Sequence, residues 1–347
     1  MIKYLGSKRL LVPAITEIVH RVPDVGTVLD IFSGTARVGH ALKAAGYRVI
    51  ANDHNAYAVT LARCYVEADR PEVHSEAKQL IAEFNRLPGK PGWFTETYCI
   101  QSRFFQPKNG ERIDAIREAI AAKGLPPDLE AVVLVSLMEA ADRVDSTTGL
   151  QMAYLKEWAP RAANDLCLRM PDVLPRAAAG KGRALELEAV AAARATPADV
   201  AYLDPPYNQH KYLGNYHIWE SLVRWDKPEV YGTACKRIDC RTRQSDFNSK
   251  PRFAAAFAEL VAAVRAPWIV LSFNDEGFLT REAAEALLAT RGEVTVIERD
   301  YPRYVGARIG IHNPAGEKVG RVGRLRNKEL LFVTGPEALP PPPERVS

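Results

Sequence analysis

The stretch from Val200 to Asn208 carries the residue types with the clearest chemical use. Its first four residues are mostly apolar and predict a buried strand, and the prolines that follow must end it because each fixes φ and lacks an N–H. Ligands of open α/β sheets bind beyond such strand ends. There a carboxylate, bare carbonyls and an aromatic ring would hold a planar base by its amino group; a rigid turn without a ligand is the alternative. The residues concerned are Asp204, Pro205, Pro206 and Tyr207.

A glycine-bearing turn between two predicted strands indicates a second ligand site. Strand 25–32 leads into the turn at Ser33 and Gly34, and a helix and a second strand then lead to Asp53. Spacing of about 20 residues from turn to acid is what a ribose-binding carboxylate requires. The full GxGxxG pattern is absent, which counts against a bound pyrophosphate but not against a nucleoside ligand such as S-adenosylmethionine. An ordinary βαβ unit with a solvated acid is the alternative.

An α/β sheet must position both sites, and the chain shows the α/β rhythm in two separated parts. After about residue 65 the pattern becomes mainly helical, and the α/β pattern resumes after about residue 180. We therefore predict an α/β domain of residues 1–66 and 181–335, a helical insert at 67–180 and a proline-rich disordered tail at 336–347. The expected helices are 11–22, 38–45, 76–87, 112–122, 129–143, 152–158, 253–264 and 281–290, and the expected strands are 25–32, 47–52, 183–190, 200–203, 267–273, 293–298 and 329–333.

Charge is unevenly distributed along the chain. The formal net charge is +4, yet residues 236–252 carry six basic and two acidic side chains, and residues 299–328 carry eight and two. Concentrated basic strips suit a polyanionic partner, and a solvated basic surface fits them equally well. The connection 93–112 interleaves aromatic and basic residues, which suits nucleic acid or, alternatively, core aromatics beside solvated bases. The candidate phosphate contacts are Arg103, Lys108, Arg241, Arg243, Arg303, Arg308 and Arg324.

Composition argues against several other classes of protein. With 47% hydrophobic and 25% charged residues the chain is typical of a soluble globular protein, and no apolar run approaches the ~20 residues of a membrane helix. The first residues lack the uninterrupted apolar core of a secretory signal. Five cysteines without a CxxC pair indicate free thiols in a cytoplasmic setting, and no residue grouping has metal-ligand spacing. For His210 and His217, a structural role fits better than proton transfer.

Four motifs in one order resemble the Dam-type adenine-N6 DNA methyltransferases. They are Lys3-Tyr4-Leu5-Gly6-Ser7-Lys8, Asp30-Ile31-Phe32-Ser33-Gly34-Thr35, Asn52-Asp53 and Asp204-Pro205-Pro206-Tyr207. In that family a recognition insert also precedes the last motif. Residues 271–275 and 327–331 look like later motifs of the family. The resemblance covers most of the chain outside about 67–180.

The resemblance implies a Rossmann-like, seven-stranded methyltransferase sheet with an inserted, mainly helical target-recognition domain. It implies a site-specific enzyme that transfers a methyl group from S-adenosylmethionine to the N6 amino group of an adenine flipped out of double-stranded DNA, with no metal. A cognate restriction enzyme is a further implied partner. The implied cofactor contacts are Tyr4, Lys8, Asp30, Phe32, Ser33, Gly34, Asp53, Glu186 and Asp204, and the implied catalytic residues are Asp204, Pro205, Pro206 and Tyr207.

Two departures and three alternatives accompany this resemblance. Ile31 replaces the proline usual in the family, and Ala36 and Arg37 stand where a second glycine is common; both changes bear on cofactor affinity more than on reaction type. A cytosine-N4 methyltransferase would also methylate an exocyclic amine, but such enzymes more often carry Ser at the position of Asp204. An RNA adenine methyltransferase and a DNA-binding module without catalysis also stay open, and the intact Asp204 and Asp53 speak against the module.

Overall fold

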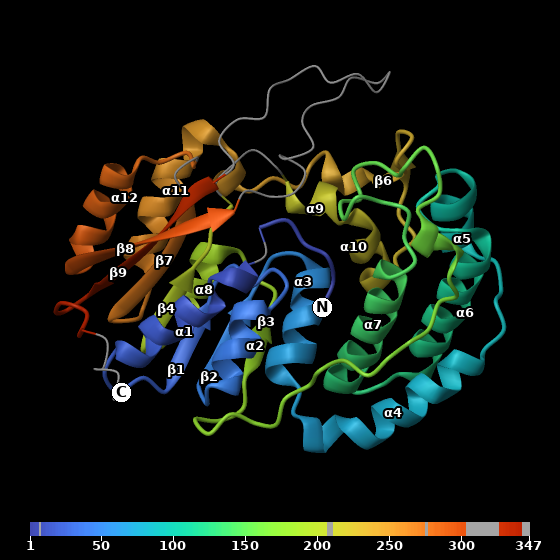
Figure 1. The fold of residues 1–347 in the computed structure, drawn as a ribbon, viewed down its shortest axis with the longest axis horizontal. Coiled ribbons are helices and arrows are strands. Elements are labelled where there is room, and N and C mark those ends of the chain that lie inside the picture. The colour runs from blue at the N-terminus through green and yellow to red at the C-terminus, as the bar shows by residue number, and fades with distance from the viewer. Residues whose placement is uncertain (7, 207–210, 275–276, 303–325, 342–347) are drawn as a thin grey trace.

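The computed structural model describes residues 1–6, 8–206, 211–274, 277–302 and 326–341. Within them, a sheet of seven strands runs in the order β3-β2-β1-β4-β7-β9-β8 (Figure 1). The strands from β3 to β7 are parallel, and β9 is antiparallel to both of its neighbours. The bounds are β1 (Thr27–Asp30), β2 (Arg48–Asn52), β3 (Arg183–Leu185), β4 (Val200–Leu203), β7 (Trp268–Asn274), β8 (Glu293–Pro302) and β9 (Arg326–Gly335). The predicted fold class, a Rossmann-like methyltransferase sheet, is confirmed.

Helices cover both faces of the sheet, because successive side chains of a strand point to opposite sides. Val28 of β1 belongs to one hydrophobic core and its neighbour Leu29 to a second. The first core includes residues of α1 (Val12–Arg21), α2 (Arg37–Ala44) and α3 (Ala56–Ala62), and the second includes residues of α8 (Ala189–Ala195), α11 (Lys250–Ala263) and α12 (Arg281–Leu288). All four residues of β4 are buried, as expected of a central parallel strand.

The order of the strands creates a switch point between β1 and β4. After β1 the chain adds β2 and β3 on one side, and after β4 it adds β7, β9 and β8 on the other. A crevice opens beyond the carboxyl ends of the two strands at such a point. Because β1 ends at Asp30 and β4 at Leu203, the candidate residues Asp30 and Asp204 lie at this crevice.

The mainly helical part between β2 and β3 lies at one end of the sheet, on the right of Figure 1. Phe84 and Leu134 from this part belong to the same hydrophobic core as Val28, so the predicted insert shares its core with the sheet. Its main helices are α4 (Arg70–Arg86), α5 (Trp93–Thr95), α6 (Pro107–Lys123) and α7 (Pro127–Asp142), with the π-helical turns η2 (Arg63–Glu67) and η3 (Glu96–Ile100). After β4 come α9 (Tyr212–Asn215), α10 (His217–Arg224) and the hairpin of β5 (Val230–Tyr231) and β6 (Lys236–Arg237).

Three local predictions are wrong. Residues 152–158 form no helix, because the N–H groups of Leu155 and Ala159 donate to Ser146 instead of to a preceding helical turn. The strand predicted at 183–190 ends at Leu185, and its alanine-rich end begins α8. The tail predicted as disordered contacts the body of the protein at two residues: Leu339 is buried and the Pro340 carbonyl accepts from Arg21 Nε at 2.6 Å, whereas residues 336–338 and 341 are exposed. Residues 342–347 lie outside the described residues.

Within the described ranges, every helix is too short or too polar to serve as a membrane span.

Candidate active site

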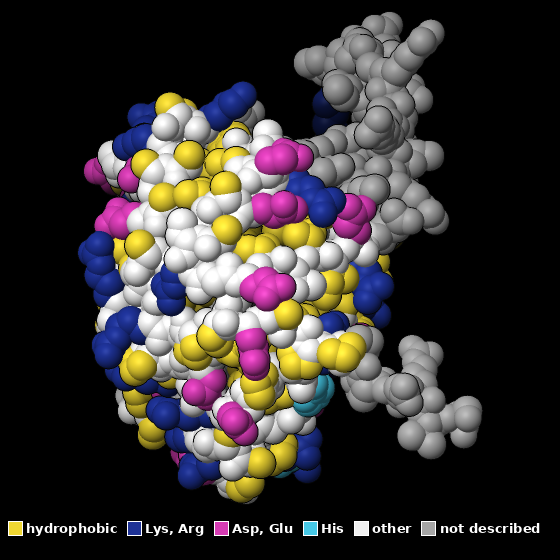
Figure 2. Space-filling model, turned by 90° about the vertical axis from the view of Figure 1, so that its left-hand side faces the viewer, with side chains coloured by type: hydrophobic (Ala, Val, Ile, Leu, Met, Phe, Trp, Pro, Cys, Tyr) yellow, Lys and Arg dark blue, Asp and Glu magenta, His cyan; other side chains and the backbone are white. Residues whose placement is uncertain are grey.

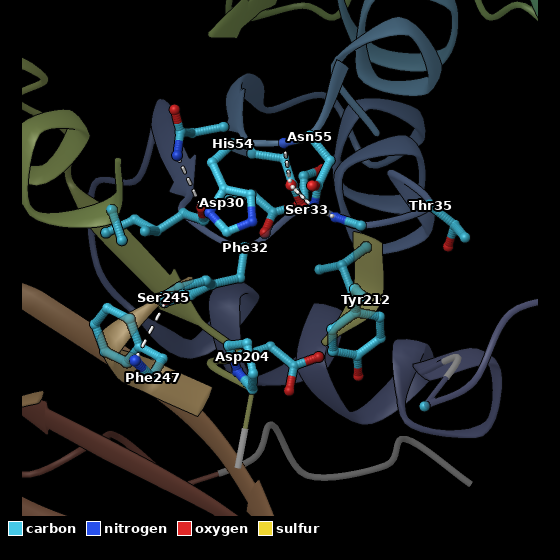
Figure 3. Close-up of a pocket in the computed structure, with 18 of the residues that line it drawn as sticks. Asp30, Phe32, Ser33, Thr35, His54, Asn55, Asp204, Tyr212, Ser245 and Phe247 are labelled. Atoms are coloured by element: carbon cyan, nitrogen blue, oxygen red, sulfur yellow. Dashed lines mark hydrogen bonds between the residues drawn. The ribbon is translucent and has the colours of Figure 1, made fainter. Parts of the chain in front are cut away.

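A cavity of about 890 Å³, its open mouth included, lies at the switch point (Figure 3). Both Asp53 and Asp204 line it, so the two predicted sites open onto one space. In Figure 3, Asp204 lies across the cavity from Ser33 and His54. The lining residues predicted from sequence are Tyr4, Lys8, Asp30, Phe32, Ser33, Gly34, Asp53, Asp204 and Pro206.

The loop after β1 presents buried polar atoms to the cavity. Both carboxylate oxygens of Asp30 and the Ser33 hydroxyl are buried and make no hydrogen bond of good geometry within the described residues, although the Ser33 hydroxyl lies near enough to Asp30 to oppose the rise of its pKa. Burial raises the pKa of Asp30 to about 7. Buried polar groups are rarely left without a partner, because losing water without compensation costs about 1–3 kcal/mol. Their position on a cavity wall therefore indicates that a ligand supplies the missing partners.

Asp53 fixes this loop. Its Oδ2 accepts from the Gly34 N–H at 3.1 Å, and its Oδ1 accepts from the Asn55 N–H at 2.9 Å. Gly34 has φ +53°, a backbone conformation that favours glycine, and a Cβ there would lie 3.4 Å from the Tyr4 ring. Burial raises the pKa of Asp53. A carboxylate has about four acceptor positions, so Asp53 can also bind a ligand hydroxyl.

Lys8 links the cavity to the end of β4. Its side chain is only 6% exposed, and its Nζ lies 3.2 Å from Asp204 Oδ1 and 3.3 Å from Glu329 Oε2. Burial raises the pKa of Asp204 to about 6, and the Lys8 ammonium opposes that rise. Lys8 thus lines the cavity, where a cofactor contact was predicted, and also pairs with the predicted catalytic acid.

Tyr4 lies between two other tyrosines at the mouth of the cavity. Its ring stacks on Tyr216 and Tyr212, with centroids 4.5 and 5.4 Å apart, and its hydroxyl lies 3.3 Å from that of Tyr57. Pro206 lines the cavity, whereas the buried Pro205 is not among the lining residues. The predicted stacking residue Tyr207 lies outside the described residues.

Several lining residues were not predicted from sequence. Asn52 joins three strand ends, because its side chain bonds Ile31 O and both the N–H and the carbonyl of Leu187. Its place beside Asp53 was a usable signal. Ser245 and Phe247 come from the segment before α11, and the Phe247 ring meets Phe32 edge-on at 5.1 Å. No local sequence pattern marks these two residues, since packing brings them to the cavity from about 200 positions away.

The structure places Glu186, which was predicted as a cofactor contact, outside the set of residues that line the cavity. Its carboxylate accepts from Arg224 Nη2 at 2.7 Å on the side facing α10. The cavity wall is formed by the residues that follow, Leu187 and Glu188.

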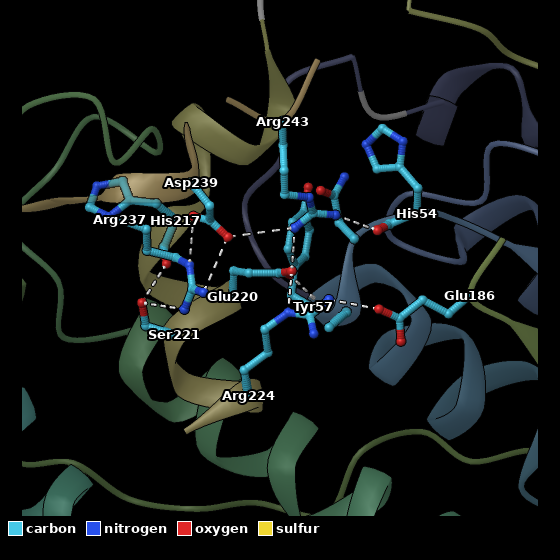
Figure 4. Close-up of polar contacts among 12 residues, drawn as sticks. His54, Tyr57, Glu186, His217, Glu220, Ser221, Arg224, Arg237, Asp239 and Arg243 are labelled. Atoms are coloured by element: carbon cyan, nitrogen blue, oxygen red, sulfur yellow. Dashed lines mark hydrogen bonds and ion pairs between the residues drawn. The ribbon is translucent and has the colours of Figure 1, made fainter. Parts of the chain in front are cut away.

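Arg243, which was predicted as a phosphate contact, takes part in an ion-pair network of the protein (Figure 4). Its guanidinium pairs with Glu220 at 3.0 Å and donates to the His54 carbonyl at 2.6 Å. The fully buried Glu220 also pairs with Arg224 and accepts from the Tyr57 N–H. This network ties α10 and the segment after β6 to α3, directly behind the loop of Asp53.

Replacing Glu220 by Ala should lower the free energy of unfolding by about 3 kcal/mol, because it removes the shared partner of two arginines and one backbone N–H. Urea denaturation would measure this. As a control, Glu259→Ala removes an exposed ion pair with Arg194 and should have little effect. Equal stabilities of the two variants would contradict the structural role of the Glu220 network.

The remaining predicted DNA contacts are exposed or outside the described residues. Arg103 lies over the Trp158 ring, Lys108 pairs with Asp165, and Arg241 lies over the Tyr231 ring at 4.0 Å. Arg303, Arg308 and Arg324 are not described. The face in Figure 2 shows basic and acidic side chains interspersed, without a broad patch of one sign. Tyr98, Phe104 and Phe105 are buried, which matches the alternative of core aromatics for the connection 93–112.

The histidine and cysteine side chains show structural environments. His217 is fully buried with Nε2 2.9 Å from the Gln151 carbonyl, and burial lowers its pKa to about 3, so the structural role fits. His210 lies outside the described residues. All five cysteines are free. The described part of the chain contains no cluster of three or more His, Cys, Asp or Glu side chains that could hold a metal ion.

The sheet order and the cavity at its switch point define a Rossmann-like methyltransferase. The chain belongs to the family of D12 class N6 adenine-specific DNA methyltransferases, whose profile matches residues 4–261. The resemblance to adenine-N6 DNA methyltransferases is thereby confirmed.

Three relatives are similar in sequence to this chain over most of its length. Modification methylase StsI of Streptococcus sanguinis is 28% identical over 87% of this chain and 48% of its own length. Type II methyltransferase M.FokI of Planomicrobium okeanokoites is 29% identical over 84% of this chain and 47% of its own length. Type II methyltransferase M.NlaIII of Neisseria lactamica is 28% identical over 79% of this chain and 83% of its own length. The chain thus spans about half the length of the first two.

Proposed function

We propose that this chain transfers the methyl group of S-adenosylmethionine to the N6 amino group of adenine in double-stranded DNA. Membership of an adenine-specific family supports the reaction, and the observation that carries it for this chain is the shared cavity of Asp53 and Asp204. The relatives' names, modification methylase and Type II methyltransferase, support a role in protecting DNA from a cognate restriction enzyme.

The cavity suits S-adenosylmethionine on three observations. The unpartnered Asp30 carboxylate and Ser33 hydroxyl match the polar methionine end, and they lie on the loop that Asp53 fixes. Asp53 keeps acceptor capacity for the ribose hydroxyls. The Tyr4 ring and Phe32 add apolar walls. When bound there, the sulfonium would supply an electrophilic methyl group.

The chain's own residues would provide orientation and electrostatics more than strong-base chemistry. The adenine amino group is a poor nucleophile, because its lone pair is delocalised into the ring. Asp204 would accept one N–H and the Pro205 carbonyl the other, which favours a tetrahedral nitrogen aimed at the methyl group. The carboxylate also stabilises the positive charge that develops on nitrogen. Tyr207 would stack on the flipped base, whose extrusion costs a few kcal/mol.

Methylation sequencing of DNA from a host that expresses the chain tests this function. We expect N6-methyladenine at one short recurring sequence and none in the host that expresses Asp204→Ala. Modified cytosines at a recurring sequence would favour the cytosine-N4 alternative, and unmodified DNA would refute DNA methylation by this chain.

DNA binding should weaken at least about tenfold between 50 and 200 mM salt, because phosphate contacts release counterions. Fluorescence anisotropy with a labelled duplex would measure this. Binding of S-adenosylmethionine, followed by calorimetry at the same salt concentrations, should change little and serves as the control. A salt-independent DNA affinity would contradict a partner held by its phosphates.

A further inference from the structure

One face of the sheet gathers ionisable side chains at the edge where the cavity lies. Strand β9 runs antiparallel to β7, so the beginning of β9 lies at the edge where the parallel strands end. Ser272 of β7 pairs with Leu331, and Glu329 stands two residues before Leu331 on the same face. On β4, Tyr202 pairs with Asp30 of β1 and with Val270 of β7, and Asp204 follows it by two positions. The antiparallel strand therefore brings a carboxylate, that of Glu329, beside the catalytic edge.

Lys8 lies between this carboxylate and Asp204. Its ammonium is 3.2 Å from Asp204 Oδ1 and 3.3 Å from Glu329 Oε2, and both Lys8 and Glu329 are buried. A buried ammonium requires charged or hydrogen-bonding partners, because an unpaired charge in the interior costs several kcal/mol. Glu329 supplies one such partner and is not among the residues that line the cavity, so it contacts the site through Lys8, while its own negative charge opposes the ionisation of Asp204.

We propose that Glu329 is a positioning residue that holds the Lys8 ammonium against Asp204, so that the Asp204 carboxylate stays ionised and oriented toward the adenine amino group. This inference rests on the proposed function, because it assigns Asp204 the role of accepting an N–H. Since Lys8 contacts Oδ1, Oδ2 is the oxygen that accepts the amine hydrogen. Lys8 of the N-terminal motif and Glu329 of strand β9, which are far apart in sequence, thus both act on one catalytic acid, Asp204.

The test is the pH dependence of the single-turnover rate constant of methyl transfer for the wild type, Lys8→Met and Glu329→Gln. Methyl transfer requires ionised Asp204, so activity rises with pH through the pKa of that carboxyl. Lys8→Met removes the stabilising cation and should move the rising limb upward by about one pH unit or more. Glu329→Gln releases the Lys8 ammonium from its position beside Asp204, so the limb should also move upward, by less than in Lys8→Met; loss of the Glu329 charge alone would move it downward. Asp30 and Tyr202, the other ionisable groups near Asp204, are unchanged in both variants.

Upward shifts in both variants distinguish a residue that positions Lys8 from a charge that acts directly on Asp204. Lys8→Arg, which keeps the charge, should return the limb toward the wild type. The matched control is Lys43→Met, which breaks a buried pair with Asp69 away from the cavity and should leave the limb unmoved. Calorimetry with S-adenosylmethionine verifies that each variant is folded. If Glu329→Gln does not fold, Glu329→Asp keeps the charge but shortens the reach, and should lower plateau kcat about tenfold without moving the limb.

The possible failures are distinguishable. A wild-type protein that methylates no DNA would refute the proposed function. A methylating wild type whose limb is unmoved by both substitutions, or is moved downward by Glu329→Gln, would overturn the positioning role. Glu329→Asp with wild-type kcat and pH profile would overturn it as well.

Discussion

Replacing Asp204 by Ala should reduce the rate of methyl transfer by at least about 10³-fold while leaving S-adenosylmethionine binding within about twofold. The loss follows because the carboxylate both orients the amino group and stabilises the charge that develops on it, and such preorganised electrostatic contacts dominate many catalysed rates. Cofactor binding should persist because Asp53, Asp30 and Ser33, on the far side of the cavity, are untouched. Transfer of a radiolabelled methyl group to duplex DNA, together with calorimetry, measures both quantities.

A matched control lies at the opposite end of the same strand. Asp199 precedes β4, and its Oδ2 accepts from the N–H groups of Gly26 and Thr27, so Asp199→Ala should lower stability and leave kcat near the wild type. Substantial methyl transfer by Asp204→Ala, at a rate close to that of Asp199→Ala, would remove Asp204 from the mechanism.

Replacing Asp53 by Ala should weaken S-adenosylmethionine binding by about 10²-fold or more. The substitution removes the acceptor proposed for the ribose hydroxyls and also releases the loop, because Asp53 holds the N–H groups of Gly34 and Asn55. Hydrogen bonds to charged groups contribute about 1.5–3 kcal/mol each, and a factor of 10² corresponds to about 2.7 kcal/mol. Isothermal calorimetry measures the dissociation constant directly.

Asp53→Asn provides a graded comparison. It retains one carbonyl oxygen that can still accept from Asn55 but loses the charge, so its dissociation constant should fall between those of the wild type and the Ala variant. At saturating cofactor both variants should keep most of kcat, because Asp204 and Lys8 are unchanged. Wild-type affinity in Asp53→Ala would show that the ribose acid lies elsewhere.

The centre of the fold was predictable because its signals are local. The apolar run that ends at Asp204 and the βαβ unit that ends at Asp53 each specify a strand and its carboxyl end. Parallel strands bring such ends to one edge of a sheet. The shared cavity of Asp53 and Asp204 therefore follows from residue order and topology.

The rest of the site depends on packing between distant segments. Ser245 and Phe247 reach the site through tertiary contacts, and the residues around them show no pattern that would mark them. Glu329 lies in a segment that resembles a later family motif, but that segment does not indicate its pairing with Lys8. Arg243 was predicted as a phosphate contact because it lies in a basic strip, but its guanidinium pairs with the buried Glu220. Residues 152–158 have helical spacing, yet the N–H groups of Leu155 and of the following Ala159 donate to Ser146. Expectations from local sequence are overridden where buried tertiary partners offer more favourable hydrogen bonds or ion pairs.

The most direct test of the central claim is nucleoside analysis of duplex DNA after incubation with the protein and S-adenosylmethionine labelled in its methyl group. The shared cavity of Asp53 and Asp204 predicts that mass spectrometry will find the label in N6-methyldeoxyadenosine and in no other nucleoside. Label in N4-methyldeoxycytidine, or DNA that remains unlabelled with the protein folded and the cofactor bound, would contradict the claim.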